Sequence, residues 1–308
     1  NERLKSLGFQ TEESLIARAE SLRTVSPHAP IREPVRRLTR AIVLSRVTLG
    51  ADVAITSVIL ERLKRTFPGT EIVLAGGAKA AQLFGGDPKI RFKEIGYSRA
   101  GTTIERLLAW VDLLESVREL TEGLRPDEYL IVDPDTRLTQ LGLLPITTSS
   151  DRHRYLFFPS REYGSDTSQS LGELTAGWLD QVFGETQATY PLITPRAGDL
   201  DLALWLVKRM KRPIISINFG VGENQRKRVG PEFEASLVAS LIRKGATIIL
   251  DKGADENENK RADAVIAQAT QIEREGRRVS AIEVDEEYLL RASNFEFPET
   301  DLLVWNGG

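Results

Sequence analysis

A chain of 308 residues, 41% of them hydrophobic, is long enough for two domains of ordinary size with buried cores. The formal net charge of -3 gives no basic footprint of the kind that nucleic-acid-binding proteins show, so we expect no nucleic-acid partner. The sequence has no cysteine and two histidines, which excludes disulfides, cysteine nucleophiles and metal sites built from thiolates or several histidines.

Residues 1–40 are polar and predict a helical N-terminal extension. After Thr11 an amphipathic run places four apolar side chains on one helical face. They are Leu15, Ile16, Ala19 and Leu22. Three prolines then indicate a linker or short turns. No apolar run approaches the roughly 18 residues that a membrane span needs, and the absence of cysteine is compatible with a cytoplasmic protein.

From Ala41 the pattern changes to alternating strands and helices. Continuous apolar runs are typical of strands that are covered on both faces. The expected order is strand 41–44, helix 53–65, strand 71–75, helix 78–84, helix 103–120, strands 129–132 and 155–158, and helix 171–183. Such an order implies parallel pairing with right-handed crossovers, so we expect an α/β domain over residues 41–190.

A polar connection over 184–195 precedes a second α/β unit, expected over residues 191–308. Its predicted elements are helix 199–211, strand 213–218, helix 231–244, strand 247–250, helix 257–276 and strand 302–305. In doubly wound sheets, ligands bind where the carboxyl ends of strands lead into helices. Two such turns of this sequence therefore stand out.

The first turn, Ser45 to Asp52, joins strand 41–44 to the helix expected after it. Gly50 supplies a residue that tolerates unusual backbone angles. Asp52 is placed near the helix start, where a carboxylate is stabilised as an N-cap. A carboxylate held at the end of a strand also suits a general base that takes a proton from a hydroxyl. Spacing alone favours the N-cap, and the two roles are compatible.

The second turn, Asn218 to Glu232, carries Gly220 and three consecutive cations ahead of a helix. The cations are Arg226, Lys227 and Arg228. Flexible backbone, positive charge and a helix N-terminus suit a phosphate group. A solvated basic loop has the same composition, so both interpretations stay open here. Two further segments are interpreted without function: Asp133-Pro134-Asp135 as turn chemistry and Arg161 as part of a charged, solvated edge.

Taken together, the two turns resemble glycosyltransferase family 9, the ADP-heptose:lipopolysaccharide heptosyltransferase group. The first turn and the helix after it match the family pattern with eight residues: Arg46, Gly50, Asp52, Val53, Thr56, Leu60, Leu63 and Lys64. The second turn matches an Asn-Pro-Gly-Ala and Lys-Arg-Trp-Pro-Pro-Glu pattern with Asn218-Phe219-Gly220-Val221 and Lys227 to Glu232. The departures are Ala51 between Gly50 and Asp52, Phe219 for a proline, and Val229-Gly230 for Trp-Pro.

The resemblance implies a GT-B fold, in which two Rossmann-like domains face each other across a cleft. It implies inverting transfer, without a metal or other cofactor, from a nucleotide-diphosphate sugar to a glycan or lipid-linked acceptor; a lipid-linked acceptor would bring the protein to a membrane surface. Asp52 would be the catalytic base, and Arg46, Gly50 and Thr56 would line the cleft. Asn218, Gly220, Arg226, Lys227 and Arg228 would bind the donor diphosphate.

The family's later Asp-(Ser/Thr)-Gly-Pro segment does not occur in this sequence, so we expect the donor-side domain to be incomplete in it. Two other functions stay open. One is a sugar-nucleotide epimerase with the same two-domain shape. The other is a non-catalytic nucleotide-sugar-binding or scaffold protein, because the extra Ala51 and the replaced loop tryptophan are also what a degenerate site would show.

Overall fold

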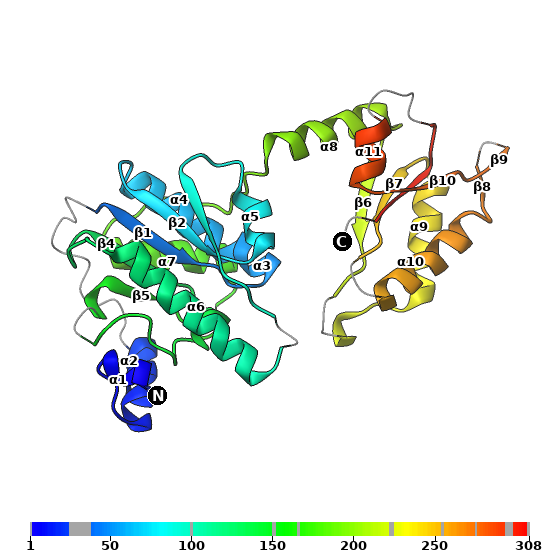
Figure 1. Ribbon diagram of the computed structural model, residues 1–308. Coiled ribbons are helices and arrows are strands. Elements are labelled where there is room, and N and C mark those ends of the chain that lie inside the picture. The colour runs from blue at the N-terminus through cyan, green and yellow to red at the C-terminus, as the bar shows by residue number, and fades with distance from the viewer. Residues whose placement is uncertain are drawn as a thin grey trace. The chain divides into compact units, whose positions relative to one another are not determined.

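The computed structural model describes residues 2–24, 38–98, 101–149, 152–164, 167–221, 225–253, 256–274, 276–292 and 298–306. It divides into two compact units, residues 1–196 and 197–308 (Figure 1). Each unit contains its own parallel sheet with helices on both faces. The two α/β units expected from the sequence are therefore confirmed.

The sheet of the first unit has five parallel strands in the order β3-β2-β1-β4-β5. Their bounds are β1 Arg40–Leu44, β2 Glu71–Gly76, β3 Ile90–Glu94, β4 Tyr129–Asp133 and β5 Tyr155–Phe157. The central strands β1 and β4 are almost wholly buried, which explains their uninterrupted apolar sequences. Because the pairing is parallel, the carboxyl ends of β1 and β4 lie next to each other at one edge of the sheet.

Helices cover both faces of this sheet. One face carries α6 (Thr103–Thr121), whose apolar side packs into a core formed with Ile42, Leu44 and Ile131. The other face carries α4 (Ser57–Thr66), α5 (Ala78–Phe84) and α7 (Leu171–Phe183), which surround Val43 and Leu74. The sequence predicts α5 with the observed bounds, and α6 and α7 to within a residue.

The N-terminal segment belongs to the first unit. Helices α1 (Glu2–Ser6) and α2 (Glu12–Thr24) lie beside α6 and β5 (Figure 1). Leu7, Phe9 and Leu22 join the core on the α6 face of the sheet. Ile16 is exposed, contrary to its expected place on the apolar face, and Arg18 is buried in that helix instead. The linker expected around the three prolines lies outside the described residues.

The second unit has four parallel strands in the order β10-β11-β7-β6. Their bounds are β6 Ile214–Asn218, β7 Thr247–Asp251, β10 Ala281–Val284 and β11 Leu302–Trp305. Helices α9 (Pro231–Arg243) and α10 (Glu256–Ala269) cover one face of the sheet. Helices α8 (Ala197–Arg209) and α11 (Glu286–Ala292) cover the other.

Four details differ from the sequence prediction. Strands β3 and β10 and helix α11 were not expected, and the helix expected over 257–276 ends at Ala269. A two-stranded hairpin, β8 (Glu273–Arg274) with β9 (Arg277–Arg278), follows α10.

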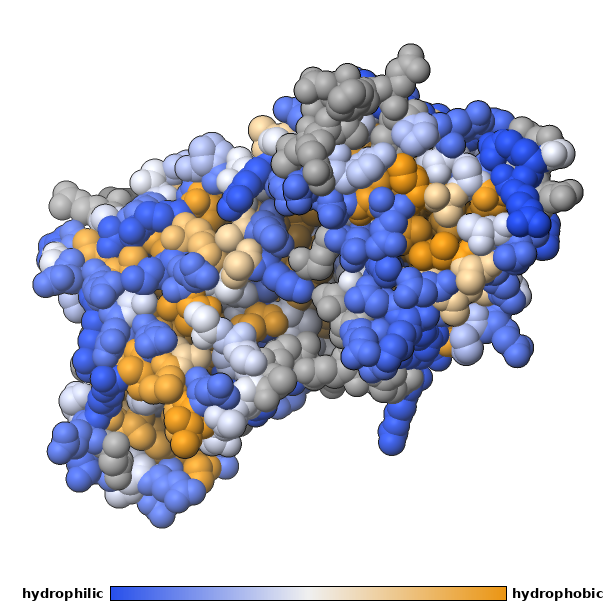
Figure 2. Space-filling model, turned by 45° about the vertical axis from the view of Figure 1, so that its right-hand side comes forward, coloured by the Kyte–Doolittle hydropathy of each residue, from blue (hydrophilic) through white to orange (hydrophobic). Residues whose placement is uncertain are grey.

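Hydrophobic side chains gather in patches on the surface (Figure 2). Ile104, Leu107 and Leu108 at the start of α6 are exposed, although their helical spacing with Leu114 and Val117 would put them on one apolar side of that helix.

Candidate functional site

Asp52 lies at the carboxyl end of β1 and is 3% exposed. One carboxylate oxygen, Oδ1, accepts hydrogen bonds from the backbone N–H of Arg46 (2.7 Å) and the hydroxyl of Thr56 (2.7 Å). The other, Oδ2, accepts a hydrogen bond from the hydroxyl of Ser45 (2.8 Å). These contacts tie the turn after β1 to the helix that follows it.

The expected N-cap role of Asp52 is wrong, because the helix starts earlier than predicted. Helix α3 (Leu49–Ala51) runs without interruption into a π-helical turn over Asp52–Thr56 and then into α4. The backbone N–H of Ser57 bonds to the carbonyl of Asp52, five residues back. Single π-helical turns of this kind inside α-helices are rare and are frequently found at functional sites.

The unusual backbone angle expected at Gly50 occurs elsewhere in the turn. Gly50 lies within α3, and a Cβ atom added there would meet no other atom within 4 Å. Val47 has a φ of 59° instead. A β-branched residue rarely adopts such a left-handed conformation, so the turn after β1 is strained at Val47.

Arg46 reaches from this turn to the loop after β4. Its side chain is about nine-tenths buried, and its guanidinium donates to the carbonyl of Asp135. Arg161 donates to the same carbonyl (2.8 Å) and to the carboxylate of Asp135, which is fully buried. Asp135, at a φ of 64°, therefore holds two guanidinium groups beside the Asp52 turn.

Asp133, the last residue of β4, is also a buried carboxylate. It accepts hydrogen bonds from the backbone N–H of Thr136 (2.8 Å), the hydroxyl of Thr139 (2.6 Å) and the hydroxyl of Tyr155. Thr136 in turn donates to the carbonyl of Ser45 (2.5 Å), so the loops after β1 and β4 are joined directly. The segment that we interpreted as turn chemistry is thus the buried support of the Asp52 site.

Burial controls the protonation of this site. It raises the pKa of Asp52, and the hydrogen bonds from Thr56, Arg46 and Ser45 oppose that rise. Burial likewise raises the pKa of Asp133 and of Asp135. The pKa of Arg46 is lowered by burial and by the neighbouring charge of Arg161. A carboxyl group whose pKa is raised toward neutrality is better matched to general-base catalysis than an exposed one.

The second candidate turn follows β6 in the other unit. The side-chain amide of Asn218 donates to Asp251 at the end of β7, and its oxygen accepts from the backbone N–H of Gly220 (2.6 Å). A Cβ at Gly220 would come within 2.9 Å of side-chain oxygens of both Asn218 and Glu258. A larger residue at this position would therefore displace the ends of these two flexible side chains.

The three cations of this turn have different surroundings. Arg226 and Lys227 are exposed on a single 3-10 turn (Gln225–Lys227). Arg228 is half-buried, and its Nε and Nη2 atoms lie buried without a hydrogen-bond partner among the described residues. With Gly220 it lines a pocket at the ends of β6 and β7, whose other charged groups are Glu234, Asp251, Lys252, Glu258 and Arg261. The pocket thus mixes both signs of charge.

Within the described part of the chain, no group of three or more histidine, aspartate or glutamate side chains could hold a metal ion. Over the same residues, no helix combines the length and the apolar character needed to cross a membrane. Sequence reasoning proposed Asp52 and Gly220 as site residues, which stays a prediction, and did not foresee the contacts of Ser45, Asp135 and Arg161. Ser45 lies 7 residues from Asp52 in the sequence, and Arg161 lies 26 residues from Asp135. Contacts at these separations produce no local sequence pattern.

Each unit is a Rossmann-like α/β unit with its polar groups at the carboxyl ends of parallel strands. The glycosyl transferase family 9 structure from Veillonella parvula DSM 2008 has a similar fold, with a TM-score of 0.54. The two chains are 18% identical, over 75% of this chain and 67% of that chain. The fold that the resemblance implied is confirmed by this similarity, while the facing of the two units across a cleft stays a prediction.

Two heptosyltransferases of E. coli are similar at a lower level. WaaC with ADP has a TM-score of 0.45 and is 14% identical, over 88% of this chain and 91% of that chain. ADP-heptose lps heptosyltransferase II also has a TM-score of 0.45 and is 12% identical, over 86% of this chain and 72% of that chain. No family model and no curated protein matches the sequence at a significant level.

Proposed function

We propose that the protein is a glycosyltransferase that moves a sugar from a nucleotide-diphosphate donor to a hydroxyl group of a glycan or lipid-linked acceptor. The observation that carries the proposal is Asp52, a buried carboxylate held by three hydrogen bonds at the end of the central strand β1. The similarity of the fold to the family 9 structure supports it, as does the resemblance of the segment from Arg46 to Leu63 to that family's sequence pattern. A heptose is the sugar that the sequence resemblance suggests.

The proposed reaction inverts the configuration at the anomeric carbon of the sugar and needs no metal. The acceptor oxygen attacks the anomeric carbon while the bond from that carbon to the diphosphate oxygen breaks, and Asp52 takes the hydroxyl proton. Among the described residues, Oδ2 of Asp52 accepts a hydrogen bond from Ser45, so it has capacity for the acceptor hydroxyl. Burial raises the pKa of Asp52, which increases its affinity for that proton.

The departing diphosphate would be stabilised in the second unit. Lys227 and Arg226 are exposed to solvent ahead of α9, and Arg228 points buried guanidinium nitrogens into the neighbouring pocket. Helix α9 begins with Gly230 as its N-cap and Pro231 in its first turn, so its free N–H groups add a partial positive charge. Together these groups would offset the negative charge that develops on the leaving group.

The test compares two variants with a panel of nucleotide-diphosphate sugars and acceptors. Asp52→Asn should lower kcat by roughly 100- to 10,000-fold with little change in donor affinity, as expected for loss of a general base. Lys227→Ala should weaken binding of the nucleoside diphosphate by about tenfold, whereas Lys260→Ala, which removes an exposed lysine of α10 paired with Glu256, should not. Full transfer activity in Asp52→Asn would overturn the base assignment.

The products separate this proposal from its rivals. A new glycosidic bond supports transfer, whereas a free, altered sugar would indicate an epimerase. Absence of binding to ADP, UDP and GDP by the wild-type protein would indicate a scaffold, in which Asp52 serves only to tie the turn after β1 to its helix.

A further inference from the structure

The loop after β4 contains an unusual run of backbone conformations. Gln140, Leu141 and Gly142 have φ values of 50°, 63° and 82°, so three consecutive residues are left-handed. Side chains other than glycine disfavour this region, and such residues persist only where their surroundings hold them. Asp135, with a φ of 64°, lies earlier in the same loop.

The N-terminal helix α2 supplies groups that hold this run. The Arg18 guanidinium donates to the carbonyl of Gly142 (2.5 Å), and the Arg23 guanidinium donates to the carbonyl of Leu141 (2.9 Å). Arg18 also lies over the ring of Tyr155, 5.0 Å from its centroid, and Arg23 lies over the ring of Phe157 at 5.6 Å. Each guanidinium is therefore held between an aromatic ring of β5 and a carbonyl of the loop.

The same helix reaches the site through a short series of contacts. Arg23 Nη2 lies 3.7 Å from Asp135 Oδ1, an oxygen that is buried without a hydrogen bond from any described residue. The carbonyl of Asp135 accepts from the side chain of Arg46, and the backbone N–H of Arg46 donates to Asp52. A displacement of the loop after β4 would thus move Arg46, and with it a donor of Asp52.

We infer that α2 fixes the loop after β4 in its strained form, with Arg18 and Arg23 acting as positioning residues for the Asp52 site. The effect on catalysis rests on the proposed function, whereas the effect on the loop does not. The N-terminal extension, which sequence analysis left without a partner, is on this basis a part of the site's support.

Hydrogen exchange tests the effect on the loop in the full-length protein. The amides of Leu141 and Leu144 bond to the carbonyls of Thr136 and Thr139, and the Gly142 amide bonds to the Thr139 hydroxyl. In Arg23→Met and in Arg18→Met we expect these three amides to exchange at least tenfold faster, while the amides of β1 and β2 keep their rates. Methionine keeps an apolar stem over the ring and removes the donor.

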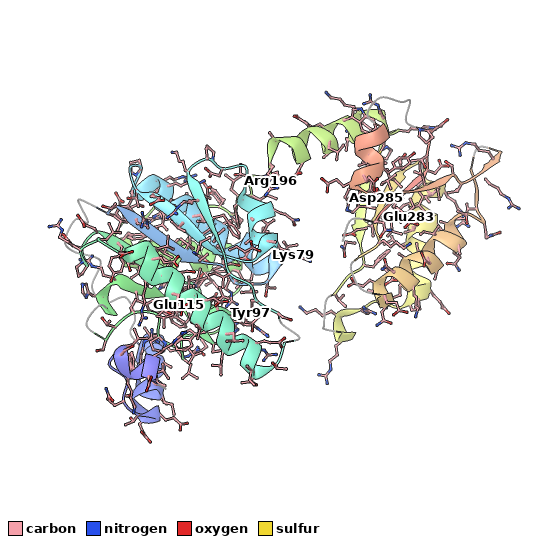
Figure 3. All side chains as sticks on the ribbon, viewed as in Figure 1. Lys79, Tyr97, Glu115, Arg196, Glu283 and Asp285 are labelled. Carbon is pink, nitrogen blue, oxygen red and sulfur yellow. The ribbon has the colours of Figure 1, made fainter. Side chains whose placement is uncertain are left out.

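Two variants serve as controls. Arg3→Met removes a cation of α1 that pairs with Glu115 of α6 (2.9 Å; Glu115 is labelled in Figure 3), and it should leave loop exchange unchanged. Arg23→Lys restores the charge and one donor, so we expect exchange between that of the wild type and Arg23→Met. Should Arg18→Met fail to fold, the partly exposed Arg23 still decides the matter.

Steady-state kinetics test the effect on the site. Arg23→Met should lower kcat about tenfold and leave the KM of the donor unchanged, because the donor cations lie in the other unit, and Arg23→Lys should recover part of kcat. Unchanged exchange at Leu141, Gly142 and Leu144 in folded Arg23→Met would overturn the inference. If exchange is faster in Arg23→Met but the wild-type protein transfers no sugar, the role of α2 in holding the loop is upheld and the proposed function is refuted.

Discussion

The buried carboxyl groups of the first unit are costly to ionise. Burial raises the pKa of Asp52, Asp133 and Asp135 above the ordinary value for aspartate. At a pH below that ordinary value, the folded and unfolded chains both carry the protons. As the pH rises, the unfolded chain loses its protons first, so ionisation favours unfolding until the folded-state pKa is reached.

Asp133→Asn makes this cost measurable, because Asp133 is fully buried and the change preserves its shape. Above about pH 4, the free energy of unfolding of the wild type should fall with rising pH, relative to the variant, by up to about 1.4 kcal/mol per pH unit. Urea unfolding between pH 4 and pH 7 provides the measurement. Asp112→Asn, at an exposed position of α6, is the control and should follow the wild type. Parallel pH profiles for Asp133→Asn and the wild type would show that Asp133 ionises equally in both states.

Sequence analysis at this scale named Arg46 and Thr56 together with Asp52, but not Ser45 or the contact between Arg46 and Asp135. Asp52 follows a continuous apolar run and belongs to a motif, so its place at a strand end could be deduced. Arg46 and the Asp135 carbonyl that it contacts are 89 residues apart, and only the pairing of β1 with β4 brings them together. The strain at Val47 was also hidden, since neighbouring Gly50 offered a more obvious position for unusual backbone angles.

At the scale of elements, Gly142 is the point where the left-handed run meets β5. A Cβ at this position would lie 2.7 Å from a ring atom of Phe157, in addition to the cost of a φ of 82°. Gly142→Ala should therefore lower the free energy of unfolding by about 1–3 kcal/mol. Gly177→Ala is a matched comparison, because Gly177 lies inside α7 with no atom within 4 Å of an added Cβ.

The same replacement of glycine by alanine should change the free energy of unfolding in opposite directions at the two positions. Gly177→Ala should raise stability by roughly 0.5–1 kcal/mol, since alanine loses less conformational entropy in a helix. Urea unfolding of both variants at one pH is sufficient. Equal effects on stability would mean that the left-handed loop relaxes freely when Gly142 is replaced, and that it is not rigidly held.

The elements that could be predicted are those with a one-sided or continuous apolar pattern. Helices α5, α6 and α7 and the buried strands β1, β4 and β7 have such patterns. Strand β3 at the edge of its sheet alternates apolar and charged residues over only four positions, Ile90 to Lys93, and β10, also an edge strand, has four residues. The π-helical turn was not foreseen, because the helix predicted from the sequence begins at Val53, inside that turn.

At the scale of the whole molecule, the chain consists of two units, each with hydrophobic cores on both faces of its sheet. The order of strands and helices was enough to predict this, because parallel sheets need helical crossovers on both sides. The similarity to the family 9 structure agrees with the prediction at the level of the fold. The two units also differ in the groups near the carboxyl ends of their strands, with the buried carboxylates Asp52, Asp133 and Asp135 in the first and three consecutive cations in the second.

This difference between the two units predicts that a nucleoside diphosphate binds to the second unit. Bound at 100 times its Kd, ADP or the best ligand among ADP, UDP and GDP should stabilise the second unit by about 2.7 kcal/mol, which slows exchange of its most protected amides by roughly 100-fold. The slowed amides should lie in β6, β7 and α9, whereas amides of Ser45 and Thr56 in the first unit should keep their rates. Lys227→Ala at the same ligand concentration should reduce the effect. Slower exchange confined to the first unit would place the nucleotide beside Asp52 and reverse the proposed assignment of donor and acceptor sides.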